Sequence, residues 1–228
     1  MSPRAPSPRR PWLLGAALLA LSLALPGCKK KKSAEDGDAV VGNGVAKTEE
    51  RTLAPFNSLH FGTILEGKYT VGPPRVSLRG DANLLPLIRI ESTPDHVWFK
   101  QEKTLKPAMR LSAEISGPPL NEILVDIASR LNVEGLHAAH LHVRGAGAAQ
   151  LEAAGSTDEL VAEASMVAKL DLRHLAVRKA KVTASGAAQV QLGYVEELDV
   201  ETRGPARVSY MGDPKITRSE GRPPAKQN

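Results

Sequence analysis

Hydrophobic and polar residues alternate in the second half of the chain, in a pattern that returns about every 20 residues. Gap-free copies begin at Leu141, Leu160, Ala180 and Leu198, so their starts lie 19, 20 and 18 residues apart. Alternation with a period of two is typical of a strand with one buried face. Recurrence at a nearly fixed period indicates an architecture in which the copies stack on one another.

Three aligned columns of these copies are apolar throughout. They are Val143/Ala162/Val182/Val200, Leu151/Leu170/Val190/Val208 and Ala153/Leu172/Leu192/Tyr210. A fainter copy from Ile123 brings the number to about five. One such unit cannot bury its apolar face alone, but units stacked about 4.8 Å apart share a narrow core. We therefore predict an all-β fold, a β-solenoid with rungs of about 20 residues that is clearest over 120–215. The alternative is a meander or sandwich of short strands with coincidental spacing.

Glycines mark one corner of the predicted rungs. Gly147, Gly186 and Gly204 fall in one column, where a tight corner requires positive φ, and the second copy has Met166 there instead. Upstream, residues 53–111 also alternate like strands, with turns at 72–74 and 93–95. Residues 81–88 (DANLLPLI) predict a short turn or helix end.

The N-terminus has the pattern of an export signal. Three arginines precede the apolar run Trp12–Leu25, which is too short for a stable helical span across about 30 Å of hydrocarbon. Leu25-Pro26-Gly27-Cys28 follows and resembles the lipobox of bacterial lipoproteins, whose cysteine is acylated after cleavage. We predict lipidation at Cys28, the only cysteine in the chain. The alternative is an ordinary secretory signal with a chance cysteine. In the enteric sorting rule, an Asp directly after the lipidated cysteine retains a lipoprotein at the inner membrane. The residue at this position is Lys29, which favours the outer membrane by analogy.

Charge and composition predict the boundaries of the remaining segments. Residues 29–45 are charged and small, which predicts a flexible tether, and residues 217–228 lack periodicity, which predicts a disordered tail. The expected organisation is a signal peptide over 1–27, a lipidated tether over 28–45, the solenoid domain over 46–216 and the tail over 217–228.

The basic charge does not indicate nucleic-acid binding. Residues 1–32 hold seven of the 30 basic residues and no acidic one, leaving 23 basic against 25 acidic residues in the rest. Such a nearly neutral body cannot neutralise a phosphate backbone, so no nucleic-acid partner is expected. The eight aromatic residues suit a narrow aliphatic core better than an aromatic ligand cage.

The order of motifs resembles one known family. Phe56-Asn57-Ser58-Leu59, then DANLLPLI, then repeats ending in Tyr210-x-Gly212-Asp213-Pro214, are similar to the auto-transporter adhesin head GIN domain family, over about residues 45–216. The resemblance implies a right-handed parallel β-helix at the cell envelope, with no established catalytic residue. The corners depart from the usual Ser-Gly-Ser-Gly-Asp pattern, for example at Arg144-Gly145-Ala146-Gly147.

Common catalytic and cofactor motifs are missing from the sequence. There is no Gly-x-Ser-x-Gly or P-loop pattern, so we expect no enzyme activity, no catalytic residue and no cofactor. His137, His140 and His142 are weak metal candidates, with Glu122 and Glu159 one rung away, but we expect three solvated histidines and no metal site. Paired carboxylates such as Glu49-Glu50 are expected in solvated turns.

The sequence therefore predicts a lipid-anchored envelope protein whose solenoid binds a protein or glycan, or acts as a scaffold, without catalysis. It places the protein at the outer membrane, held there by the anchor. The alternative is a carbohydrate-active enzyme, a polysaccharide lyase or hydrolase, since β-helices also host those activities. Such enzymes need clustered acidic and basic side chains in a groove.

Overall fold

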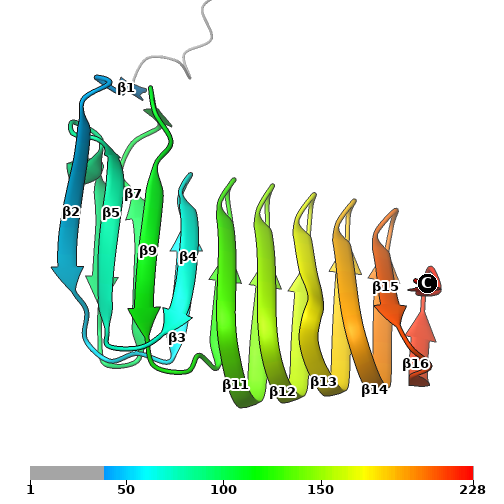
Figure 1. The fold of residues 1–228 in the computed structure, drawn as a ribbon. Helices are drawn as coiled ribbons and strands as arrows, with labels where there is room; N and C mark the ends of the chain where they lie inside the picture. The colour runs from blue at the N-terminus through cyan, green and yellow to red at the C-terminus, as the bar shows by residue number, and fades with distance from the viewer. Residues whose placement is uncertain (1–38, 228) are drawn as a thin grey trace, which may run out of the picture. The chain divides into compact units, whose positions relative to one another are not determined.

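The structure is a computed structural model that describes residues 39–227, and in this part of the chain it is a β-solenoid without α-helix (Figure 1). The strands are β1 (Val40–Val41), β2 (Ala46–Thr52), β3 (Ser58–Gly62), β4 (Glu66–Val71), β5 (Arg75–Asp81), β6 (Ile88–Ser92), β7 (His96–Gln101), β8 (Leu105–Lys106), β9 (Ser112–Gly117), β10 (Glu122–Val125), β11 (Arg130–Gly145), β12 (Gln150–Ala164), β13 (Lys169–Ser185), β14 (Gln189–Arg203), β15 (Arg207–Met211), β16 (Lys215–Glu220) and β17 (Ala225–Lys226). A short 3-10 helix covers Leu85–Leu87, inside the segment predicted to form a turn or helix end.

The strands form two faces that enclose the core. The front face consists of β2, β5, β9, β4, the first halves of β11 to β14, and then β15 and β17. The back face consists of β6, β7, β3, β10, the second halves of β11 to β14, and β16. The long strands β11 to β14 bend midway and so belong to both faces, which makes each of them one rung (Figure 1).

The predicted rung register is confirmed for two of the three columns. Leu151, Leu170, Val190 and Val208 are successive parallel partners, and so are Val143, Ala162, Val182 and Val200. In the third column only Leu172 and Leu192 are paired. Register shifts after Glu152 and after Gln191 displace Ala153 and Tyr210, because successive rungs differ in length by one or two residues.

The core changes character along the solenoid axis. The rungs from residue 130 to 208 are filled by buried Leu, Val and Ala. The larger space near the N-terminus holds the buried rings of Phe56, Phe61, Tyr69 and Phe99, and the rings of Phe61 and Phe99 on neighbouring strands lie 5.1 Å apart between centroids at an interplanar angle of 57°. The core and the strands that close it lie wholly within residues 39–227.

The predicted corner column has positive φ at every rung. Gly147, Gly186 and Gly204 have φ of 67°, 68° and 73°, and Met166 has φ of 62°. Ile127, which the sequence analysis did not single out, has φ of 62° at the matching corner of the preceding rung. Backbone hydrogen bonds link these corners: Ala148 N donates to Ile127 O at 2.7 Å, and Ala187 N donates to Met166 O at 2.6 Å.

The expected disordered tail is wrong for residues 217–227. β16 pairs in parallel with β14, and β17 pairs with β15. Thr202 also fixes the turn between them, since its hydroxyl oxygen accepts a hydrogen bond from Arg222 N at 2.6 Å. The open end of a solenoid presents unpaired backbone groups, and pairing with them stabilises a segment whose composition alone predicts disorder.

The tether expected over 28–45 is also too long at its C-terminal end, because residues 40–45 belong to the folded domain. β1 pairs with β8, and the carboxylate of the fully buried Asp81 accepts hydrogen bonds from the backbone N–H groups of Gly44 (2.7 Å), Ala108 (3.0 Å) and Met109 (3.2 Å). These contacts fix residues 40–45 to the domain. The signal peptide, Cys28 and the tether up to residue 38 lie outside the described residues.

Leu170 tests the rung register. It is 1% exposed and lies between Leu151 and Val190, so Leu170→Asp buries a carboxylate without a partner and should lower the free energy of unfolding by about 4 kcal/mol or more. The control Lys181→Gln changes an exposed side chain of the same strand and should cost under about 0.5 kcal/mol. Equal denaturation midpoints for the two variants contradict the register.

Candidate binding surface

The three predicted histidines lie near one another in sequence but have separate partners. His137 Nδ1 is 2.9 Å from Ser156 Oγ, His140 Nδ1 is 2.9 Å from Glu159 Oε2, and His142 Nδ1 is 3.3 Å from Glu122 Oε1. The rung-to-rung pairing of His140 with Glu159 and of His142 with Glu122 agrees with the predicted register. Within residues 39–227, no group of three or more His, Cys, Asp or Glu is arranged to hold a metal ion.

A second histidine site lies around His60, and the sequence pattern does not predict it. His60 Nε2 is 2.8 Å from Asp126 Oδ2, and its ring stacks on Trp98 at 4.8 Å. Lys100 Nζ lies 3.5 Å from the centre of the Trp98 ring. These residues come from β3, β7 and the corner after β10, and their separations in sequence do not follow the 20-residue repeat. The stack ties neighbouring strands of the back face together.

A polar groove crosses the front face over β9, β4 and the first halves of β11 to β14. Its volume is about 650 Å³. Two columns of outward side chains form most of the lining: Glu66, Arg130, Gln150, Lys169 and Gln189 in one, and Lys68, Asn132, Glu152, Asp171 and Gln191 in the other. Parallel stacking thus repeats a hydrogen-bonding side chain at every rung, about 4.8 Å apart.

Ion pairs hold several groove side chains in place. Glu66 binds Arg110 at 3.0 Å through one oxygen and Arg130 at 3.1 Å through the other, and Arg130 Nε donates to Gln150 Oε1 at 3.2 Å. Hydrogen bonds from Arg173 lower the pKa of Asp171, so this carboxyl group is ionised at neutral pH. A general acid needs a raised pKa instead. The groove lining carries four acidic and four basic residues, whose formal charges cancel.

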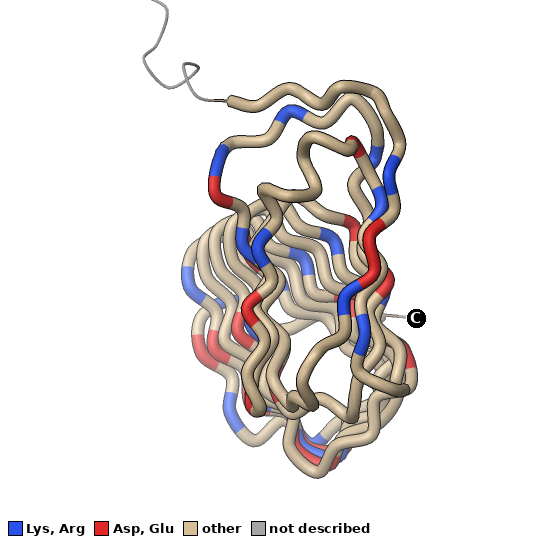
Figure 2. The backbone as a smooth tube through the Cα atoms, turned by 90° about the vertical axis from the view of Figure 1, so that its left-hand side faces the viewer, with Lys and Arg blue, Asp and Glu red and all other residues tan. Residues whose placement is uncertain are grey.

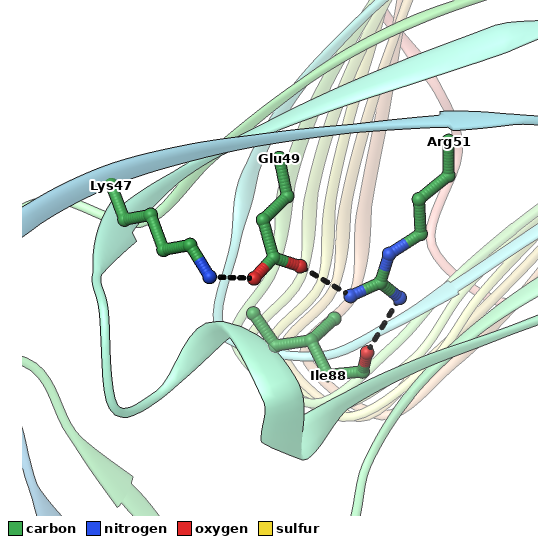
Figure 3. A network of polar contacts seen from close by, with 4 residues as sticks. All are labelled: Lys47, Glu49, Arg51 and Ile88. Carbon is green, nitrogen blue, oxygen red and sulfur yellow. Dashed lines mark hydrogen bonds and ion pairs between the residues drawn. The ribbon is translucent and has the colours of Figure 1, made fainter.

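A polar network closes the N-terminal end. Figure 3 shows Lys47, Glu49 and Arg51 side by side on β2, pointing toward the segment around Ile88. Glu49 accepts hydrogen bonds from Lys47 Nζ and Arg51 Nη2, both at 2.8 Å, and Arg51 Nη1 donates to Ile88 O at 3.3 Å. The expectation that Glu49 lies in a solvated turn is wrong, because β2 pairs with β5 along its full length. Charged side chains on an edge strand of this kind oppose further strand pairing.

Comparison with known families identifies the domain. The family model described as "Putative auto-transporter adhesin, head GIN domain" matches residues 55–214, which is more than half of the chain. The fold and this match together show that the chain belongs to the head GIN domain family. No curated protein matches the chain.

Solved structures share the fold at low sequence identity. A putative adhesin from Bacteroides fragilis matches with a TM-score of 0.65 and 17% identity, covering 82% of this chain and 96% of that one. A putative adhesin from Parabacteroides merdae matches with a TM-score of 0.53 and 15% identity, covering 83% and 98%. A putative lipid binding protein from Parabacteroides distasonis has a TM-score of 0.52 and 15% identity, covering 83% and 100%. None of these descriptions names an enzyme.

Glu49 predicts a pH-dependent stability of the N-terminal end. Hydrogen bonds from Lys47 and Arg51 lower its pKa in the folded protein below the ordinary value of 4.5. The stabilisation is therefore present above pH 4.5 and is lost as the pH falls through the lower, folded-state pKa. Glu49→Gln should lower the melting temperature at pH 7 and reduce its fall between pH 5 and about pH 3. The neighbouring Glu50→Gln on the opposite face of β2 is the control; if it has the same effect, the network is not the cause.

Proposed function

We propose that this protein is a lipid-anchored envelope lipoprotein whose solenoid binds a ligand without transforming it. The observation that carries the binding role is the groove of the front face, where acidic, basic and amide side chains repeat in register over consecutive rungs. Ion pairs preorganise these side chains, which lowers the cost of ordering them on binding. The family's description as an adhesin supports a location at the envelope or cell surface.

The anchor is supported by the sequence. Cys28 ends a lipobox-like segment after an apolar run, and it is the only cysteine. Among the residues that the structure describes, no helix is both long and apolar enough to span a membrane. Acyl chains on Cys28 would hold the protein at the bilayer, since each buried CH₂ contributes about 0.8 kcal/mol. Lys29 after the cysteine supports the outer membrane as its location.

The ligand that fits the groove is an uncharged polar chain, a glycan or a protein segment. The balanced charges of the lining give no net field to attract a strongly charged partner, so binding should depend only modestly on salt. Amide side chains at Asn132, Gln150, Gln189 and Gln191 both donate and accept hydrogen bonds, as hydroxyl groups and peptide groups require.

Removal of the cysteine tests the anchor. Cys28→Ala should leave the precursor uncleaved or release the protein from the membrane, and it should abolish acyl-chain labelling. The measurement is detergent partitioning together with labelling by a radioactive fatty acid. Equal partitioning and labelling of the variant and the natural protein would contradict lipidation at Cys28.

Glycan and peptide arrays test the groove. The domain should retain at least one class of immobilised ligand, and replacing Gln150 and Gln191 by Ala should weaken that binding about thirtyfold, since two lost hydrogen bonds cost about 1 kcal/mol each. The matched control replaces Lys181 and Thr183 of the back face by Ala. Binding that is lost equally in both variants places the ligand elsewhere. Products released from a bound glycan would support the carbohydrate-active alternative and contradict the non-catalytic role.

A further inference from the structure

Two tight corners of the solenoid have a residue other than glycine, and the stability of the fold does not explain its presence there. Ile127 and Met166 adopt positive φ, where side chains with a Cβ are strained and β-branched residues are rare. Their side chains are 45% and 64% exposed. Three other rungs have glycine at this position. Strained backbone combined with exposed apolar surface is typical of a position retained for contact with something else.

More exposed apolar side chains lie along the same edge. We define the tight-corner edge as the turns 126–129, 146–149, 165–168, 185–188 and 203–206 together with the N-terminal segments 40–45 and 102–110; it is the upper edge in Figure 1. Besides Ile127 and Met166, it exposes Val41 (64%), Val45 (57%) and Val167 (53%). Five of the ten exposed large hydrophobic residues of the described chain therefore lie there.

Basic residues border this apolar edge. Arg130, Lys169 and Arg207 begin three of the strands that leave the tight corners on the front face, and Arg203 is the first residue of the last corner. Arg110 and Lys103 belong to the N-terminal loop, and Figure 2 shows Lys and Arg on the loops at this end. Ion pairs neutralise part of this charge, since Arg110 and Arg130 share Glu66 and Arg203 binds Glu201. The other acidic residues nearby are also engaged, Glu102 with Arg89 and Asp126 with His60.

We propose that the tight-corner edge docks on the surface of an anionic phospholipid bilayer. Exposed aliphatic side chains bordered by Arg and Lys suit the boundary between headgroups and acyl chains, where the apolar tips insert and the cations meet phosphate. The inference deepens the proposed anchoring at Cys28. Ten residues, 29–38, separate that cysteine from Ala39, so the chain enters the domain at most about 40 Å from the bilayer. It enters at this edge, because β1 lies there (Figure 1).

Vesicle co-sedimentation tests the docking without the anchor. The domain over residues 37–228, which holds the whole core and lacks both Cys28 and the lysines of the tether, is mixed with vesicles of phosphatidylglycerol and phosphatidylcholine or of phosphatidylcholine alone. We expect binding to the anionic vesicles at low salt, with a loss of about tenfold or more at high salt and on neutral vesicles.

A glycine variant separates docking from folding. Ile127→Gly, Met166→Gly and Val167→Ser together should weaken vesicle binding about tenfold or more without lowering the melting temperature, since glycine is the residue that other rungs use at this corner. The matched control removes exposed apolar side chains elsewhere, by Val161→Ser and Tyr194→Ser, and should bind like the natural domain.

Vesicle binding that is unchanged in the glycine variant, or absent from the natural domain, overturns the proposal. Self-association that the variant loses, measured by sedimentation velocity without vesicle binding, also overturns it and assigns the edge to a second copy. Neither result bears on Cys28, whose acylation is measured separately.

Discussion

In-register parallel stacking is the constraint on which the rest of this structure depends. A rung of 18 to 20 residues has too little apolar surface to fold alone, so each buried column is complete only when a neighbour extends it, as Leu170 is by Leu151 and Val190. From residue 131 to residue 208 the hydrophobic side chains buried in the narrow interior are all aliphatic. The same stacking fixes the corners, since the carbonyl groups of Ile127 and Met166 accept hydrogen bonds from the next corner.

Stacking also leaves two ends that must be closed and an outer surface that is free to vary. Antiparallel strands β2 and β5 and the charged side chains of β2 close the N-terminal end, while at the other end β16 pairs with β14 and β17 pairs with β15. Outward-facing side chains do not have to fit into the buried core. Their side chains therefore form surfaces of different chemistry on one scaffold: a polar groove on the front face and an apolar, basic edge at the tight corners.

The sequence predicts the regular part of this fold because each rung repeats the same local pattern. Alternation such as that around Val143 and Leu151 is visible within a single copy, glycine recurs at the corner in three copies, and comparison of copies gives the register. The ends are not predictable in this way. Segment 40–45 consists of valine, glycine and asparagine, and segment 217–227 is polar and irregular; both become ordered only through partners far away in the chain, such as Asp81 and Thr202.

The candidate surfaces likewise have a part that the sequence repeat predicts and a part that it does not. The pairing of His142 with Glu122 follows from one rung of separation, whereas the His60–Trp98 stack joins residues from strands outside the repeat. The groove requires both the register and the N-terminal strands β9 and β4, so the sequence repeat reveals only its C-terminal half. Met166 was visible as an exception in the glycine column, but its exposure and its neighbours on the edge depend on the folded rungs.

Native-state hydrogen exchange measures the dependence of each rung on its neighbours most directly. The account predicts that backbone amides of β12 and β13 in the middle of the stack are the most protected, and that protection declines rung by rung toward β15 to β17 at one end and toward β2 and β6 at the other. If amides of β12 and β13 exchange as fast as those of β16, or if protection follows hairpins of consecutive strands instead of position in the stack, the stacked-rung account is contradicted.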